Sequence, residues 1–149
     1  MSGFERSTCI KAPVASVWEV LADIGSIADW NPGVVRSYVT GDRAGEVGAA
    51  RHCDLGGKNY LDEEVVEWEE GRLLTMRVVG SNMPFKTADI RFTLSAKGEG
   101  TAVTVAPEYS LRGGILGRLM DGLVVRRMYI RGMEALLSGL KAQVEVEGD

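Results

Sequence analysis

The sequence predicts an α+β fold in which a curved antiparallel sheet wraps around one long C-terminal helix. Two observations lead to this prediction. Apolar and polar residues alternate in successive short segments that are joined by Gly-containing turns, which is typical of an antiparallel meander. From Ile115 to about Val144, apolar residues instead recur at helical spacing.

The first strand is expected at Phe4–Ile10, where apolar and polar residues alternate. Two short helices should then precede the second strand. The first begins at Ala12-Pro13, because proline is well tolerated at the start of a helix. Asp23 can cap the second helix, and Asn31-Pro32-Gly33 should end it.

Six further segments have strand-like alternation, and short turns such as Gly56-Gly57 separate them. These predicted strands are 34–40, 49–55, 59–69, 72–79, 85–95 and 101–111. With the N-terminal strand, the sheet has seven strands. Gly122, Gly132 and Gly139 lie in the predicted C-terminal helix and each costs about 1 kcal/mol relative to Ala. We expect them to permit a close approach to the sheet or a bend.

Composition limits the classes of function. The 149 residues are 45% hydrophobic, which is typical of one globular domain spanning residues 1–149. A net charge of −4 without a basic stripe argues against nucleic-acid binding. No apolar run is long enough for a membrane span, so we expect no stable membrane insertion, and we see no signal peptide.

The cysteine and histidine content indicates the redox compartment and argues against a metal site. Cys9 and Cys53 are read as free thiols in a reducing, cytoplasmic compartment. A catalytic cysteine would have only His52 to activate it, and the alternation of its strand favours a surface position for this histidine. With one histidine a His-rich zinc site is excluded, and we expect no metal and no cofactor.

A long helix cannot fill the whole concave side of a twisted sheet, so we expect a cavity between them, and such cavities are the usual ligand sites. The alternative is that side chains fill the space. The candidate ligand-binding residues on the strands and in the helix, chosen mostly from the inward parity of each strand and from the helical projection, are Met76, Val78, Phe85, Ala88, Ile90, Tyr109, Met120, Leu123 and Arg127.

The strand at 59–69 does not sort cleanly into two faces. We take Tyr60, Asp62 and Glu64 as inward, on the parity of Trp68, because Tyr60 and Trp68 have the larger apolar areas to bury. A carboxylate in the cavity suits a general base or a hydrogen-bond acceptor. The alternative is a solvated carboxylate at the cavity mouth or on the convex face.

Arg126 and Arg127 fall within or beside the apolar stripe of the helix. An inward arginine needs an anionic partner, such as a cavity carboxylate or a ligand. The alternative is that their methylene groups cover apolar surface while the charged ends reach water.

Several segments together resemble the START-like, helix-grip superfamily, which includes polyketide cyclase/dehydrase-like proteins, abscisic-acid receptors and lipid-transfer domains. The segments that carry the resemblance are 10–21, 29–32, 71–80 and 109–114. They are packing and turn features, so they are specific for the fold rather than for a catalytic activity. The similarity to the abscisic-acid receptors also implies a cavity-facing acidic residue near Asp62.

The leading hypothesis is therefore a protein that binds a hydrophobic small molecule, polyketide-, aromatic- or lipid-like, between the sheet and the C-terminal helix. The alternative is a polyketide cyclase/dehydratase-type enzyme in which Asp62 or Glu64, with Arg127 or Tyr60, moves protons. A third interpretation is a partner-interaction module, which an exposed apolar patch at 80–85 or 30–34 would favour. The sequence assigns no catalytic residue and leaves the oligomeric state open.

Overall fold

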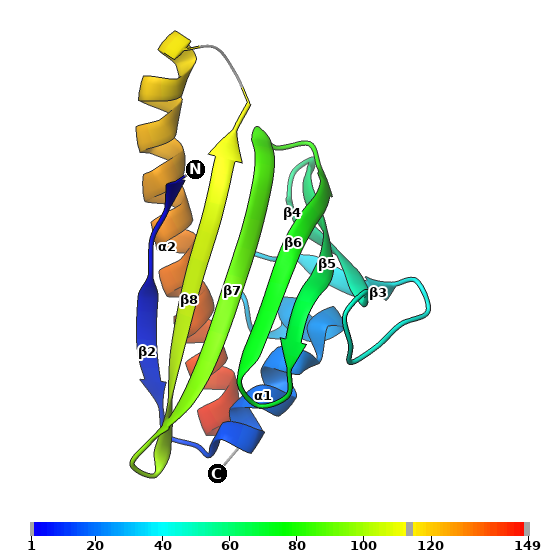
Figure 1. The fold of residues 1–149 in the computed structure, drawn as a ribbon, viewed down its shortest axis with the longest axis vertical. Helices are drawn as coiled ribbons and strands as arrows, with labels where there is room; N and C mark the ends of the chain where they lie inside the picture. The colour runs from blue at the N-terminus through cyan, green and yellow to red at the C-terminus, as the bar shows by residue number, and fades with distance from the viewer. Residues whose placement is uncertain (1, 113–114, 148–149) are drawn as a thin grey trace.

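A computed structural model describes residues 2–112 and 115–147 of the chain, and all of their side chains except those of 115–121 and 147. One antiparallel sheet curves against the long helix α2 (Figure 1). The strands are β1 (Ser2–Gly3), β2 (Arg6–Ile10), β3 (Arg36–Thr40), β4 (Ala50–Gly56), β5 (Asn59–Glu69), β6 (Leu73–Ser81), β7 (Phe85–Lys97) and β8 (Gly100–Leu111). The helices are α1 (Val14–Ala22), the 3-10 helix η1 (Ile24–Asp29) and α2 (Ile115–Glu147).

The sheet order is β1-β8-β7-β6-β5-β4-β3, and β2 also pairs with β8. The predicted N-terminal strand is thus split into β1 and β2, which share one partner. The two short helices and the meander follow in the predicted order. This confirms the predicted fold class, an antiparallel curved sheet with a C-terminal helix. Among the described residues, no helix is long and apolar enough to cross a membrane.

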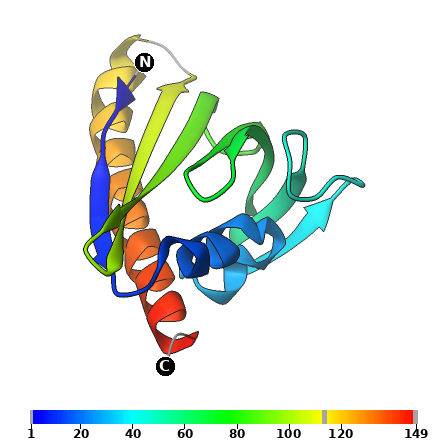
Figure 2. The same ribbon diagram turned by 60° about the horizontal axis from the view of Figure 1, so that its bottom comes forward.

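Helix α2 packs against β2, β8 and α1, while α1 and η1 close the lower end of the concave side (Figure 2). The buried side chains of α2 are Met133, Leu136, Leu137, Leu140 and Val144. They form one core with the inward residues of the sheet and of α1. Trp18 of α1 meets Trp68 of β5 edge to face at 5.1 Å, which joins α1 to the sheet.

Gly139 explains how closely α2 approaches η1. A Cβ atom at this position would lie 1.9 Å from the carbonyl oxygen of Trp30, so a side chain there would collide with the backbone. By contrast, a Cβ at Gly122 or Gly132 would meet nothing within 4 Å. Gly139 therefore permits a close approach, but to the end of η1 and not to the sheet as expected.

Candidate functional site

The face of the sheet that is turned toward α1 and α2 is called the inner face here. Its central positions on β6, β7 and β8 are Met76, Ala88, Ile90 and Tyr109, and all four side chains are buried. Strand pairing places Met76 beside Ile90 and Ala88 beside Tyr109. The structure thus brings these candidate residues together on one surface, as the alternation of the three strands predicted.

Toward the upper end of the sheet, inner-face side chains are only half-buried. Leu61, Val78, Phe85 and Tyr129 all have this intermediate exposure. The ring of Tyr129 from α2 lies 5.8 Å from Phe85 and 5.0 Å from Tyr109, so aromatic side chains from β7, β8 and α2 meet here. The inner face is therefore closed by packing near α1 and incompletely covered at its other end.

A buried polar cluster lies beside these apolar residues. Arg51 Nε of β4 donates to Glu63 Oε1 of β5 at 3.0 Å, and both side chains are at most 5% exposed. Arg51 Nη1 also donates to the carbonyl oxygen of Ile24 at 3.0 Å. The Cys53 thiol lies 3.7 Å from the same Glu63 oxygen. The pair thus satisfies the two charges inside an apolar surrounding, which is the condition for keeping them there.

Burial shifts the proton affinities of two neighbouring groups. Loss of solvation raises the pKa of the Cys53 thiol to about 12, and the positive charge of Arg51 offsets only part of this effect. Burial also raises the pKa of the Tyr129 phenol, and the negative charge of Glu63 adds to the shift. Both groups are therefore neutral at physiological pH and can offer O–H or S–H groups but not anions.

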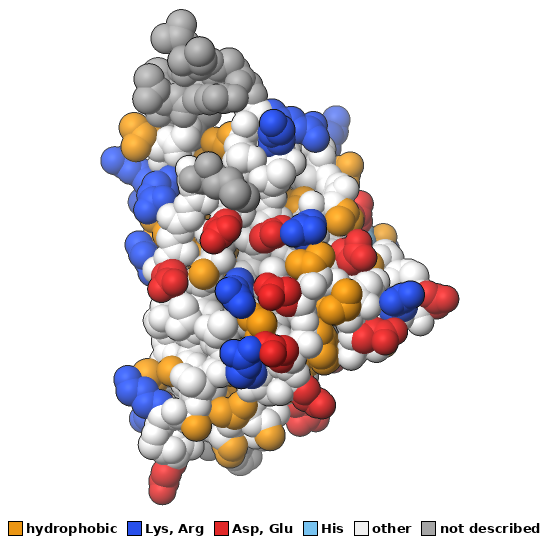
Figure 3. Space-filling model, in the orientation of Figure 1, with side chains coloured by type: hydrophobic (Ala, Val, Ile, Leu, Met, Phe, Trp, Pro, Cys, Tyr) orange, Lys and Arg blue, Asp and Glu red, His pale blue; other side chains and the backbone are white. Residues whose placement is uncertain are grey.

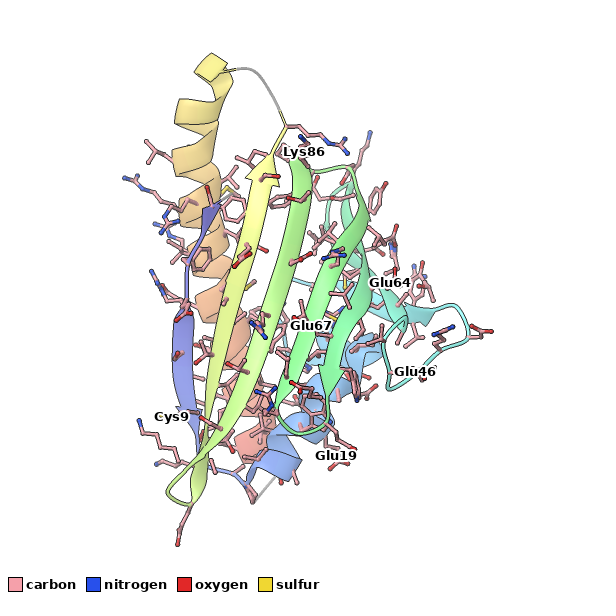
Figure 4. The ribbon with its side chains drawn as sticks, in the orientation of Figure 1. Cys9, Glu19, Glu46, Glu64, Glu67 and Lys86 are labelled. Atoms are coloured by element: carbon pink, nitrogen blue, oxygen red, sulfur yellow. The ribbon has the colours of Figure 1, made fainter. Side chains whose placement is uncertain are left out.

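The predicted orientation of β5 is wrong over most of its length. Glu63 and Val65 are buried on the inner face, whereas Tyr60, Asp62 and Glu64 belong to the opposite parity. Directly paired residues on neighbouring strands lie on the same face, so Cys53 and Leu61 point inward together. Figure 4 labels Glu64 and Glu67 along the outer side of β5.

Trp68, whose size motivated the choice, does point inward. The pairing of β5 with β6 shifts register between Val65 and Glu67, so a bulge at Val66 reverses the parity that follows. Val65 and Trp68 can therefore both contribute to the core. The argument from apolar area was correct for Trp68 and failed for Tyr60, because alternation was assumed to continue through the bulge.

Tyr60 and Asp62 instead surround His52 on the outer face. His52 Nδ1 lies 2.6 Å from Asp62 Oδ1, and Nε2 lies 2.8 Å from Asp54 Oδ1. The imidazole is stacked between the rings of Tyr38 and Tyr60, at 5.2 and 5.7 Å. Hydrogen bonds to Asp62 and then Asp54 raise the pKa of His52. The expected outer position of this histidine is confirmed.

The structure places the candidate residues of the first half of α2 in different surroundings. Leu123 is 64% exposed and Arg127 is exposed, so neither faces the sheet, because the buried residues of the second half set the rotation of the helix. Arg126 donates from Nη1 to the Gly3 carbonyl oxygen at 3.1 Å and covers the ring of Phe4. Arg126 is thus exposed rather than inward, but its guanidinium group, and not its methylene groups, lies over the apolar ring. The side chain of Met120 lies outside the described residues.

Sequence reasoning missed Glu63 as an interior carboxylate. A two-residue turn at Gly56-Gly57 would place Tyr60 opposite Cys53, but the structure has the turn at Gly57-Lys58 and a bulge between Asp54 and Gly56, which together place Leu61 opposite Cys53. In that register Arg51 faces Glu63 directly. An inward Cys53 and an inward Asp62 are compatible in the expected hairpin but not in the observed one, which contains a bulge that the sequence did not reveal.

A separate polar groove of about 410 Å³ lies between α1, η1 and the end of α2. Its lining includes Glu19, Asp23 and Asp29, and it lies at the opposite end of α2 from Tyr129. Among the residues whose side chains are described, no three His, Cys, Asp or Glu side chains are grouped so that they could hold a metal ion.

Comparison with known proteins identifies the class. Residues 1–145 match the family described as polyketide cyclase / dehydrase and lipid transport, and the chain belongs to this family. No protein with a curated description matches the chain.

Solved structures share the fold. A protein from Thermus thermophilus superposes with a TM-score of 0.83 at 21% identity, covering 99% of this chain and 100% of that one. The Zhui aromatase/cyclase from a Streptomyces species gives 0.79 at 21% identity, with 99% and 96% covered. A START superfamily protein from Mycobacterium smegmatis gives 0.76 at 15% identity, with 96% and 97% covered. The chain thus has the START-type fold.

Proposed function

We propose that the protein binds a hydrophobic small molecule, polyketide-, aromatic- or lipid-like, between the inner face of the sheet and α2. The observation that carries the proposal is the half-burial of Leu61, Val78, Phe85 and Tyr129 on a face whose central residues are buried. Apolar side chains that face inward and remain partly exposed gain by contact with an apolar ligand. Membership in a family of polyketide and lipid proteins supports this chemistry.

The polar groups of the inner face support binding rather than proton transfer. Arg51 holds the carboxylate of Glu63 in a buried ion pair, so this carboxylate is engaged before any ligand arrives. The hydroxyl of Tyr129, whose pKa is raised, is a hydrogen-bond donor to a ligand carbonyl but a poor source of an anion. Among the original candidates, Met76, Val78, Phe85, Ala88, Ile90 and Tyr109 remain the proposed ligand contacts, and Leu61 and Tyr129 join them.

A substitution that fills the proposed ligand-binding space tests this proposal. Val78→Trp places a large ring on the inner face, and we expect it to weaken binding of 1-anilinonaphthalene-8-sulfonate by at least about tenfold, or ~1.4 kcal/mol. Val79→Trp is the matched control, because Val79 is the next residue of β6 and is 57% exposed. Equal probe affinity in the two variants, with both folded by circular dichroism, would contradict the proposed site.

A cyclase or dehydratase is the second candidate. The observation that favours it is that the charge of Glu63 acts on the Tyr129 phenol, which puts a carboxylate and a hydroxyl in the same region of the inner face. Native mass spectrometry of the purified protein identifies any small molecule that co-purifies. Recovery of this molecule unchanged after incubation supports binding alone. Recovery of a form lighter by one water, from the wild type but not from Tyr129→Phe, supports the enzyme instead.

A further inference from the structure

The first half of α2 exposes apolar side chains that the proposed ligand site does not use. Leu123, Val124 and Met128 are 64%, 57% and 67% exposed. Isolated exposed apolar residues are common, but these come from a single helical segment. Their neighbours on the same side of the helix are arginines.

Arginine side chains share the face. Leu123, Arg127 and Arg131 follow one another at four-residue spacing, which aligns them along one side of a helix, and Val124 and Met128 form the adjacent row. Arg127 and Arg131 are both exposed. We call this surface, made of Leu123, Val124, Arg127, Met128 and Arg131, the outward face of α2.

The charge of this region is opposite to that of the whole protein. The chain carries a net charge of −4, yet residues 122–133 contain three arginines and no acidic residue. In the space-filling view, Lys and Arg side chains follow one another along the edge where α2 runs, with hydrophobic atoms beside them (Figure 3). Lys86 at the upper end of β7 is also exposed and extends the positive charge at this end (Figure 4).

We propose that the outward face of α2 docks the protein on the surface of an anionic lipid bilayer. Arginines provide attraction to acidic headgroups, and neighbouring apolar side chains insert at the boundary with the acyl chains. With three apolar residues the binding is weak and reversible, which suits a protein that visits a membrane rather than remaining there. The inference concerns a surface outside the ligand site and is independent of whether that site binds a ligand.

A second copy of the chain fits this face less well than a bilayer does. Pairing the face with itself brings Arg127 and Arg131 against the same arginines. Glu134 follows on the helix but is already ion-paired with Arg6 at 3.4 Å, so it offers little compensation. Arg126 is also engaged, because it donates to the Gly3 carbonyl oxygen and thereby ties α2 to β1.

Vesicle co-sedimentation of the full chain tests the proposal. We expect binding to phosphatidylcholine–phosphatidylglycerol vesicles, weakening as salt is raised, and little binding to pure phosphatidylcholine vesicles. The double variant Arg127→Ala/Arg131→Ala should lose affinity by roughly 25-fold, at about fivefold per arginine. Val124→Ser/Met128→Ser should also weaken binding, although it leaves the charge unchanged.

Matched controls alter the same chemistry elsewhere. Lys11→Ala/Lys97→Ala removes the same charge at exposed positions away from the outward face of α2, since Lys11 lies beside Glu145 at the far end of the helix, and should retain binding. Val35→Ser/Val79→Ser removes exposed apolar surface from outside the helix and should also retain it. The proposal is overturned if the wild type does not bind anionic vesicles at low salt, or if the controls lose as much as the α2 variants. It is also overturned if Met128→Ser dissociates a dimer in ultracentrifugation while vesicle binding is absent.

Discussion

Strands β4 and β5 carry two acid–base pairs at neighbouring positions, one on each face of the sheet, and the outer one is an ion pair only when His52 is protonated. Arg51 and Glu63 face inward, 3.0 Å apart, with side chains 5% and 3% exposed. His52 and Asp62 face outward, 2.6 Å apart, with side chains 20% and 42% exposed. Both pairs join directly opposite residues of the same hairpin. The two pairs belong to one hairpin and differ most in how far their surroundings exclude water.

The contrast shows that burial changes how much the loss of one partner of a salt bridge costs in stability. Water solvates either charge of the outer pair when the other is removed, so such pairs contribute about 0–1 kcal/mol. Removal of one inner charge leaves its partner without solvent or counter-charge, which costs about 3–5 kcal/mol. The two pairs also differ in their effect on ligand specificity. A charge left unpaired on the inner face could be neutralised only by an oppositely charged group of a ligand, whereas water solvates a charge on the outer face.

The largest predicted effect tests the inner pair. Arg51→Met should lower the free energy of unfolding by about 3–5 kcal/mol, since the carboxylate of Glu63 is left buried and unpaired. Arg51→Met/Glu63→Met should recover most of that loss, because no charge remains inside. Urea denaturation followed by circular dichroism measures both. If the double variant is as unstable as the single one, the loss comes from packing and not from the unpaired charge.

The second prediction compares a thiol of the inner face with one outside it. Cys9 is exposed, whereas Cys53 is buried and its pKa is raised to about 12. We expect Cys53 to react with Ellman's reagent at least ~100-fold more slowly than Cys9 near neutral pH, because the thiolate is the reactive species. The Cys9→Ser variant isolates the slow phase, and denaturant should abolish the difference. Similar rates in the native protein would mean that solvent reaches the inner face at Cys53.

The smallest effect belongs to the outer pair. The folded-state pKa of His52 is raised, so its contribution to stability is present below the unfolded pKa near 6.5 and is lost as pH rises through the folded pKa. His52→Gln should therefore cost less than about 1 kcal/mol at acidic pH and almost nothing at alkaline pH. NMR titration should show a larger fall in the His52 pKa for Asp62→Asn than for Asp54→Asn. The reverse order would contradict the dominance of Asp62.

The hairpin of β4 and β5 also shows where sequence reasoning stopped. The alternation of β7 and β8 predicted their inward residues correctly over the centre of each strand, where the alternate positions are all apolar: Ala88, Ile90, Phe92 and Leu94 in β7, and Val103, Val105, Pro107 and Tyr109 in β8. Strand β5 mixes carboxylates with apolar residues on both parities, and the burial of Glu63 depends on Arg51 across the hairpin. A single strand considered alone does not contain that partner.

Helix α2 illustrates the same limit at larger scale. The apolar stripe correctly predicted the burial of Met133, Leu137 and Val144. It also predicted an inward Leu123, which is exposed, although the two parts of the stripe look alike in sequence. Only the position of the sheet edge relative to the helix distinguishes them.

The sequence by itself determined the order of the elements, the strand boundaries to within a few residues, and the family to which the chain belongs. These follow from local periodicity and from glycine- and proline-containing turns, which act over a few residues. The tertiary structure decided which face of β5 is buried, where the bulge at Val66 reverses its parity, and which part of α2 faces solvent. These depend on contacts between residues far apart in the chain, because alternation defines two faces but does not say which one the rest of the fold will cover.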